Sequence, residues 1–357
     1  MHITIDQFRQ TVRDASHEHS PLRIVGSGSK SFYGRDTYGD ALETSRYRGF
    51  VSYEPTELVL TARSGTPLTE IEAELAAQRQ MLPFEPPHLG PRATLGGCIA
   101  AGLSGPRRAY TGAVRDYVLG IRMLDGKGDV LHFGGQVMKN VAGYDVSRLM
   151  AGSLGTLGLI LDVSLKLLPL PAEELTLHFD MAEGEALEAM NRWAAQPLPL
   201  SATCYHDGIL SVRLSGAAAA VRSARTKLGG MLVADGAAFW RSVREHQHAF
   251  FQTGSTEKTF VLWRLSLPST TQKLKVRGRQ LIEWGGALRW LVSDESAASI
   301  RQMATALGGQ ATVFHSAESN VEPFHPLSPA LLQLHQRLKQ SFDPHGIFNS
   351  GRMYREF

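Results

Sequence analysis

Short apolar runs alternate with glycine-rich or polar stretches through the first half of the chain, and each run predicts a buried strand. The runs are Leu22–Val25, Leu58–Ala62, Val118–Leu124, Val130–Phe133 and the longer Gly158–Leu168. The turn residues Asp125-Gly126 and Lys127-Gly128 predict that the third and fourth runs form a hairpin. Pro169 and Pro171 close the last run and mark a predicted domain boundary.

Two helices are predicted among these strands. Thr66 would cap the first helix, with Pro67 as its first residue and Leu68, Ile71 and Leu75 on one face. Thr94 is predicted to cap the second helix, which places Gly96 and Gly97 in its first turn. Backbone N–H groups in a first turn have no intrahelical partner, so they are available to a ligand.

The pattern changes after Pro171, where strands and helices alternate with fewer glycines. The predicted order is β-α-β-β-α-β, a ferredoxin-like arrangement, over Leu175–Phe179, Glu185–Ala195, Leu200–Tyr205, Ile209–Leu214, Ala217–Leu228 and Met231–Ala234. Strands at Phe260–Leu267, Leu288–Val292 and Ala311–Phe314 and a helix at Ser296–Leu307 extend it. From Ser328 a last helix is predicted, with Leu331, Leu334, Leu338 and Phe342 on one face. The predicted domains are 1–171, 172–327 and a terminal segment, 328–357.

Composition narrows the class of protein. The chain has 357 residues, of which 43% are hydrophobic and 20% charged, as expected of a globular protein of two domains. Its net charge of +3 is scattered and does not indicate nucleic-acid binding. No signal peptide or spanning segment is apparent, so a cytoplasmic protein is predicted. Cys98 and Cys204 have no metal-like spacing, which predicts two reduced thiols and no metal or iron–sulfur site in this chain.

Glycines concentrate in four segments: Ala93–Arg108, Thr111–Gly120, Lys139–Asp145 and Gly152–Ile160. Glycine allows the backbone to approach a ligand closely because it has no Cβ. Several such loops beside short helices predict a phosphate-bearing ligand held by the main chain, and hence a nucleotide cofactor.

The segment Gly26-Ser27-Gly28-Ser29-Lys30 follows a predicted strand and is a further candidate phosphate loop. A surface turn gives the same letters, so both interpretations stay open. The Rossmann fingerprint is absent, because the third glycine is missing and no helix opens after the loop. No GxxxxGK[ST] sequence is present either, so the chain gives no support for nucleotide hydrolysis.

The order of the segments VGSGSKSFYG, PPHLGPRATLGG, SGPRRAYTGAVRDYVLG, VMKNVAGYDVSRLMAGSLGTLGLI and FDPHGIFNSGRMY resembles the flavoprotein family of vanillyl-alcohol oxidase and D-lactate dehydrogenases. Within that family the chain is most similar, over its whole length, to the FAD-binding E subunits of bacterial glycolate oxidase, also called glycolate dehydrogenase. The resemblance implies an α+β fold, in which a PCMH-type (vanillyl-alcohol oxidase-like) FAD-binding domain is joined to a ferredoxin-like cap domain.

The resemblance also implies site residues. Gly26, Ser27, Gly28, Ser29 and Lys30 would wrap the FAD pyrophosphate. Thr94, Gly96, Gly97, Ser104 and Gly105 would hold its other side and the ribityl chain. Asp116 would lie beneath the flavin, Gly158 and Ile160 would line it, and Asn349 would return the tail to it, with a plain turn role for Asn349 as the alternative. The first loop lacks the histidine that binds flavin covalently in many relatives, so noncovalent FAD is predicted.

One departure from the family concerns the substrate. The hydroxy-acid dehydrogenases carry an HGDGN-type segment, whereas the comparable stretch here is Thr312–Asn320, and the catalytic residues stay unknown. His315 and His325 are predicted to be surface or packing residues. Arg107 and Arg108 are either anion anchors or plain loop residues. Trp284 and Trp290 are predicted to belong to the core, with an interface role as the alternative.

The resemblance therefore predicts a subunit of a glycolate dehydrogenase complex that oxidises glycolate to glyoxylate. A homologous catalytic flavin subunit and an iron–sulfur subunit would be its partners, and they would attach it peripherally to the cytoplasmic membrane. Two alternatives stay open: a self-sufficient FAD-dependent 2-hydroxy-acid dehydrogenase, and an assembly subunit with a redox-silent FAD.

Overall fold

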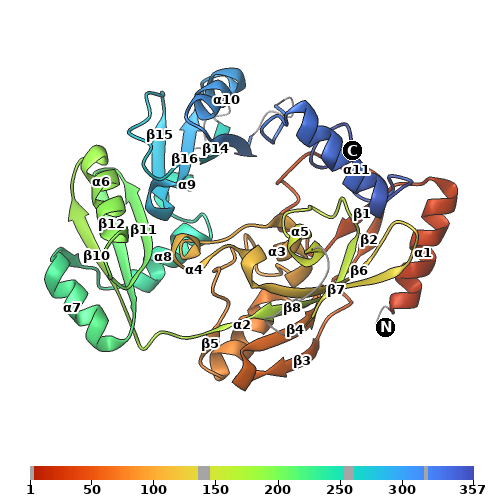
Figure 1. Cartoon of the computed structure of the whole chain (residues 1–357), viewed down its shortest axis with the longest axis horizontal. Coiled ribbons are helices and arrows are strands. Elements are labelled where there is room, and N and C mark those ends of the chain that lie inside the picture. Colours follow the sequence, from red (N-terminus) through yellow and green to blue (C-terminus); the bar gives the residue numbers. More distant parts are fainter. Residues whose placement is uncertain (1–3, 136–144, 253–260, 317–320) are drawn as a thin grey trace. The chain divides into compact units, whose positions relative to one another are not determined.

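The computed structural model describes residues 4–135, 145–252, 261–316 and 321–357. The chain forms two compact units (Figure 1). Unit 1 contains Met1–Ser104, Ala113–Leu170 and Pro326–Phe357, whereas unit 2 contains Gly105–Gly112 and Pro171–His325. The motif VMKNVAGYD, whose second part was predicted to be a ligand loop, lies largely outside the described residues.

Unit 1 is built on an antiparallel five-stranded sheet in the order β3-β4-β8-β6-β7. These strands are β3 (Phe50–Glu54), β4 (Val59–Arg63), β8 (Leu159–Lys166), β6 (Val118–Leu124) and β7 (Val130–Gly134). A parallel pair, β1 (Leu22–Val25) and β2 (Asp40–Glu43), and a short ladder of β5 (Gln80–Met81) with β9 (Leu168–Pro169) complete the strands. The predicted hairpin of β6 and β7 is confirmed.

The helices of unit 1 are α1 (Ile5–Glu18), α2 (Leu68–Ala77), α3 (Leu95–Ala101), α5 (Val146–Leu149) and α11 (Pro329–Phe342), with 3-10 turns at η1 (Pro55–Glu57) and η2 (Val114–Tyr117). Segments near both ends of the chain belong to this unit, where Leu22 forms a parallel bridge with Phe348.

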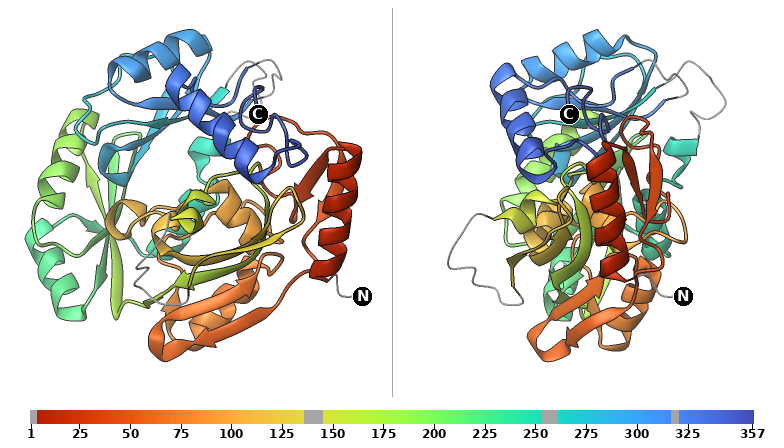
Figure 2. Two further views of the ribbon diagram at one scale, coloured as in Figure 1. Left: turned by 45° about the vertical axis from the view of Figure 1, so that its right-hand side comes forward. Right: turned by 90° about the vertical axis from the view of Figure 1, so that its right-hand side faces the viewer.

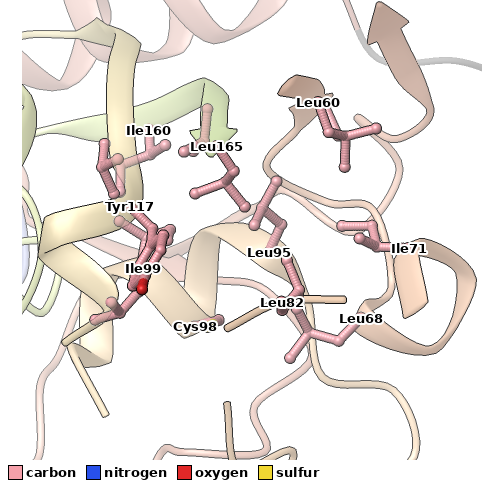
Figure 3. Close-up of a cluster of buried hydrophobic side chains, with 14 of the residues drawn as sticks. Leu60, Leu68, Ile71, Leu82, Leu95, Cys98, Ile99, Tyr117, Ile160 and Leu165 are labelled. Carbon is pink, nitrogen blue, oxygen red and sulfur yellow. The ribbon is translucent and has the colours of Figure 1, made fainter. Parts of the chain in front are cut away.

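The core of unit 1 lies between the sheet and helices α2 and α3. Leu68, Ile71 and Leu75 of α2 are fully buried there, together with Leu95 and Ile99 of α3 (Figure 3). Burial of each such side chain contributes about 1.5–3 kcal/mol. The predicted apolar face of α2 is thus confirmed. Its predicted cap is wrong, because Pro67 occupies the N-cap position and the Thr66 hydroxyl instead accepts a hydrogen bond from the Gly49 N–H at 2.9 Å.

Unit 2 contains one eight-stranded antiparallel sheet in the order β13-β10-β12-β11-β15-β16-β14-β17. Its first four strands are β10 (Glu173–Asp180), β11 (Leu200–His206), β12 (Ile209–Gly216) and β13 (Met231–Leu232). Helices α6 (Glu183–Ala194) and α7 (Ala218–Leu228) lie on one face of these strands (Figure 2). Numbered along the chain, these strands lie in the order 4-1-3-2, which is the predicted ferredoxin-like arrangement.

The other half of the sheet repeats this order. Its strands are β14 (Val261–Ser266), β15 (Arg279–Glu283), β16 (Leu288–Ser293) and β17 (Gln310–His315), with α10 (Ala297–Ala306) before the last strand. Numbered along the chain, these four strands also lie in the order 4-1-3-2, and a loop at 267–278 stands where the other half has its first helix. The halves join where β11 pairs with β15. The remaining elements are α4 (Arg108–Thr111), α8 (Gly236–Arg244), α9 (Ala249–Gln252) and η3 (Trp284–Gly286).

Candidate functional site

The loop after β1 presents backbone donors without acceptors. Gly28 has a φ of +77°, a left-handed conformation that favours glycine. Gly26 is close to α3, since an added Cβ at this position would lie 2.4 Å from the Thr94 hydroxyl oxygen. Within the described residues, the backbone N–H groups of Gly26, Ser27 and Gly28 donate no hydrogen bond. Successive backbone N–H groups in a loop of this kind suit an anionic ligand.

The backbone N–H groups in the first turn of α3 already donate hydrogen bonds within unit 1. Thr94 is the N-cap, as predicted, and its hydroxyl accepts a bond from the Gly97 N–H at 3.4 Å. The Leu95 N–H donates to the Thr66 carbonyl at 2.9 Å and the Gly96 N–H to the Ser64 carbonyl at 2.7 Å. As predicted, the Gly96 and Gly97 N–H groups have no backbone acceptor within the helix, but the Ser64 carbonyl and the Thr94 hydroxyl already pair with them.

A cavity of about 330 Å³ opens between the β1 loop, α3 and the C-terminal segment. It is lined by Arg23, Ile24, Val25, Gly26, Ser27, Gly28, Ser29, Lys30, Ser31, Asp36, Thr37, Thr94, Gly97, Ala100, Ala101, Leu154, Asn349 and Arg352. A smaller cavity of about 70 Å³ shares part of this lining and adds Thr44, Ser64, Gly96, Gly155, Gly158, Leu159 and Ile160. Because the two cavities share walls and all their lining belongs to unit 1, we name them together the ligand hollow.

The ligand hollow is electropositive at its larger end. Arg23, Lys30 and Arg352 line that cavity and Asp36 is the one acidic residue of its lining. The Lys30 ammonium donates to the His88 carbonyl at 3.0 Å, which holds the lysine at the loop. This balance favours an anionic ligand group at the loop after β1.

The smaller end carries a buried hydroxyl with an unused hydrogen-bonding capacity. Ser64 is 1% exposed, and no described residue pairs with its Oγ atom. A buried polar atom without a partner is uncommon and costs free energy, so a ligand atom is the partner that best accounts for it.

The C-terminal segment closes the hollow through side-chain hydrogen bonds. Asn349 adopts a φ of +40°, accepts from the Ile24 N–H at 2.9 Å and donates to the Leu154 carbonyl at 2.6 Å. The Arg352 guanidinium donates to carbonyls of the loop after β1, at Lys30 (3.3 Å), Ser31 (2.7 Å), Tyr33 (2.8 Å) and Arg35 (2.6 Å). Asn349 is thus more than a helix-terminating turn residue, because it ties two walls of the hollow together.

Comparison with known proteins gives this geometry a context. A family model described as an FAD binding domain matches residues 3–134. Glycolate oxidase subunit GlcE of Escherichia coli (strain K12) is 49% identical over 347 residues, which cover 97% of this chain and 96% of that protein. The chain belongs to the GlcE family. FAD is the cofactor that this homology and the domain match indicate.

Parts of the chain are also similar to other curated proteins. Glycolate oxidase subunit GlcD of Bacillus subtilis (strain 168) is 43% identical over 84 residues, 24% of this chain and 18% of that protein. D-lactate dehydrogenase of Archaeoglobus fulgidus is 31% identical over 204 residues, 55% of this chain and 44% of that protein. The chain is thus homologous to FAD-dependent oxidoreductases.

A solved structure agrees in fold. Alkyldihydroxyacetonephosphate synthase superposes with a TM-score of 0.66 at 15% identity, over 96% of this chain and 74% of that protein. The predicted α+β fold of the PCMH-type flavoproteins is confirmed by this likeness.

The ligand hollow of this GlcE-family chain fits FAD. Its unpaired amides and three cationic side chains suit a pyrophosphate. Eleven of the fourteen predicted cofactor residues line it: Gly26, Ser27, Gly28, Ser29, Lys30, Thr94, Gly96, Gly97, Gly158, Ile160 and Asn349. Among the described residues that line the two cavities there is no histidine.

Three predicted residues do not line these cavities. The Ser104 hydroxyl accepts from the Val114 N–H at 3.0 Å, and the Asp116 carboxylate accepts from the Ala113 N–H at 2.8 Å. Gly105 belongs to unit 2, where its carbonyl accepts the indole N–H of Trp284 at 3.0 Å. Each of these groups has a hydrogen-bond partner within the chain, and their contact with FAD stays a prediction.

The other candidates of unit 2 have structural partners. Arg107 is buried and pairs with Glu174 at 2.6 Å, so it serves no anion outside the protein. Arg108 stacks on Trp284, its Cζ 4.4 Å from the ring centroid. Trp284 and Trp290 are buried, as the core interpretation predicts. His325 accepts from the Ala311 N–H at 3.2 Å, which agrees with a packing role, whereas His315 is exposed at the end of β17.

Sequence reasoning missed Arg23, Ser64 and Arg352 in the lining, and Lys339 behind it. Arg352 stands in FNSGRMY, and a cation next to that terminal turn was a signal that could have identified it. Arg23 lies within β1, just before the predicted phosphate loop, whereas Ser64 follows β4 in an ordinary strand-end sequence, so only the tertiary structure brings Ser64 to the hollow.

Cys98 and Cys204 are free and buried, in agreement with the predicted thiols. Burial raises the pKa of the Cys98 thiol to about 12, and burial also raises the pKa of Cys204. In the part of the chain that the structure describes, no helix is long and apolar enough to cross a membrane. The described residues likewise contain no group of three or more histidine, cysteine or acidic residues arranged for a metal.

Proposed function

We propose that this chain is the FAD-binding subunit of a complex that oxidises glycolate to glyoxylate. The observation that carries the proposal is 49% identity to GlcE over nearly the full length of both proteins. The ligand hollow supports it, because unpaired amides and cationic side chains are gathered where a dinucleotide phosphate would need them.

In the proposed complex, the residues of the hollow have separate roles. The amides of Gly26, Ser27 and Gly28 bind the pyrophosphate, and Lys30 neutralises part of its charge. Ser64 donates or accepts a hydrogen bond at the smaller end, where Gly158 and Ile160 exclude water. The cofactor is noncovalent, which the lack of histidine in the described lining supports. When bound, the flavin supplies a two-electron acceptor for the oxidation of a 2-hydroxy acid.

The proposal includes two partners. One is a homologous flavin subunit that oxidises glycolate, and the other is an iron–sulfur subunit that takes the two electrons onward. The local similarity to GlcD supports the first partner, because it shows a related FAD-type segment in a second glycolate oxidase subunit. Peripheral attachment to the cytoplasmic membrane would come through these partners.

A self-sufficient hydroxy-acid dehydrogenase is the second candidate. The similarity to the D-lactate dehydrogenase of Archaeoglobus fulgidus over 55% of the chain favours it. In that case this chain alone would bind the carboxylate and remove the hydroxyl proton.

Anaerobic titration of the purified chain with glycolate separates the two candidates. The proposal expects that acid precipitation of the protein releases the flavin into solution. It also expects that glycolate leaves the absorbance spectrum of the bound flavin unchanged. It also expects glycolate-dependent bleaching once the homologous flavin and iron–sulfur subunits are added. Bleaching of the isolated chain by glycolate would overturn the proposal in favour of the self-sufficient enzyme. A chain that binds no FAD would overturn both candidates.

A further inference from the structure

Lys339 of α11 is a buried cation that lines neither cavity of the ligand hollow. Its side chain is 7% exposed, and its ammonium donates three hydrogen bonds. The acceptors are Asp343 Oδ2 at 2.7 Å, the Thr156 carbonyl at 2.8 Å and the Phe348 carbonyl at 2.7 Å. An ammonium has three protons, so this set satisfies it completely.

Two of these acceptors belong to the two walls of the hollow. Thr156 follows Leu154 and Gly155, which line it, and Phe348 immediately precedes Asn349, which lines both cavities. The Lys339 ammonium therefore ties the 152–158 loop to the C-terminal segment from behind. Asn349 makes a second tie between the same walls through the Leu154 carbonyl at 2.6 Å.

The counter-ion of Lys339 also orders the C-terminal segment. Asp343 accepts from the Ile347 N–H at 3.0 Å and from the Phe348 N–H at 2.8 Å, which fixes the turn that leads to Asn349. Burial lowers the pKa of the Lys339 ammonium, and the Asp343 carboxylate beside it acts in the opposite direction.

A buried ion pair is not an efficient source of stability, because desolvation offsets most of the attraction. Well-packed apolar side chains in place of both partners would avoid this desolvation cost. The arrangement is better explained by what it fixes, namely the spacing of the Thr156 and Phe348 carbonyls, whose neighbours in sequence line the hollow.

We propose that Lys339 is a positioning residue for the cofactor: through Thr156 and Phe348 it sets the separation of the 152–158 loop and Asn349, and thereby the affinity for FAD. This inference rests on the proposed FAD site. It adds a residue without cofactor contact to those that determine FAD binding.

Lys339→Met in the full chain is the test, with Lys127→Met as the matched control. Lys127 lies in the exposed turn between β6 and β7 of the same unit, and no hydrogen bond or ion pair of the described residues uses its ammonium. For each protein, the FAD dissociation constant is measured well below the unfolding temperature, together with the midpoints of thermal unfolding with and without saturating FAD.

The positioning role predicts that Lys339→Met weakens FAD binding by about tenfold or more, the size seen when a group that orients ligand-contacting residues is removed. The increase in midpoint on adding FAD should shrink accordingly. Lys127→Met should match the wild type in both measurements. A purely structural role would lower both midpoints equally and leave the dissociation constant within about twofold, and that result would overturn the inference.

Lys339→Met removes the counter-ion of Asp343 and can fail to fold. In that case the isosteric Asp343→Asn tests the inference by the same two measurements. It removes the negative charge that pairs with the Lys339 ammonium and preserves the shape of the side chain. Unchanged FAD affinity in a folded Asp343→Asn protein would also overturn the inference. Failure of the wild-type chain to bind FAD would instead refute the proposed function itself.

Discussion

Gly97 shows how a single residue controls access to the ligand hollow. It lies in the first turn of α3 and lines both cavities. An added Cβ would approach only the Thr94 hydroxyl, at 3.3 Å, so the fold can accept a side chain there with a small shift. The carboxylate of Gly97→Asp would nevertheless occupy the hollow beside the amides proposed to bind pyrophosphate.

Gly97→Asp should therefore lower FAD affinity by at least about tenfold, through steric exclusion and repulsion between anions. Flavin absorbance of the purified protein after gel filtration measures this. Gly184→Asp is the matched control, because Gly184 lies in the first turn of α6 in unit 2 and no heavy atom is near its added Cβ. Retention of full flavin content by Gly97→Asp would contradict the assignment of the hollow to FAD.

At this scale, the sequence predicted residues whose role depends on the local backbone. Gly28 adopts a left-handed conformation, and Thr94 caps α3, which begins at the next residue. Both roles can be predicted from the adjacent residues in the sequence. Ser64 could not be found in this way. Its place in the hollow depends on chain segments that are far apart in sequence, and no local pattern indicates that they meet.

The last helix shows the limit of periodicity at the scale of an element. Leu331, Leu334, Leu338 and Phe342 share one face by sequence, and α11 forms with the predicted bounds. Only Leu338 and Phe342 pack against the core of unit 1, whereas Leu331 and Leu334 are 47% and 51% exposed. Amphipathic spacing identified the helix but not how far along it the core extends.

This difference predicts unequal effects of the same truncation along α11. Leu334→Ala should change the free energy of unfolding by no more than about 0.5 kcal/mol, as expected of a surface position. Leu338→Ala should lower it by about 1–3 kcal/mol, less than for full burial because Leu338 is only partly buried. Urea unfolding of both variants measures the difference. Equal losses would mean that Leu334 is covered in solution.

The strands were predictable for a related physical reason. Residues of β8 are buried on both faces, so its sequence is a continuous apolar run in which Asp162 is neutralised by a pair with Arg122. In unit 2, β11 and β12 are joined by a short turn, whereas helices separate β10 from β11 and β12 from β13, so the order of these strands along the chain was clear. β11 pairs with β15 and so joins the two halves of the sheet, but no pattern in the sequence of either strand predicts this pairing.

At the scale of the whole molecule, the ligand hollow is assembled from segments near residues 26, 97, 155 and 350, all within unit 1. No single segment contains a complete binding motif, which is why the Rossmann fingerprint is absent although a dinucleotide is expected. The order of the glycine-rich segments along the chain carried the information instead. These segments come together only because the five-stranded sheet is formed. The resemblance to known flavoproteins predicted that they lie in one FAD-binding domain, whereas the pattern of each segment alone did not.

This assembly predicts which backbone amides respond to FAD in hydrogen exchange. The amides of Gly26, Ser27 and Gly28 lack acceptors within the described residues, so they should exchange rapidly without cofactor. Saturating FAD should slow them strongly if they bind the pyrophosphate, and the region of Leu154 and Asn349 should slow with them. Amides in the ladder of β10 with β12 in unit 2 are already paired and serve as the internal reference. Exchange in the 26–28 loop that is already slow without FAD, or that FAD leaves unchanged, would contradict phosphate binding by these amides.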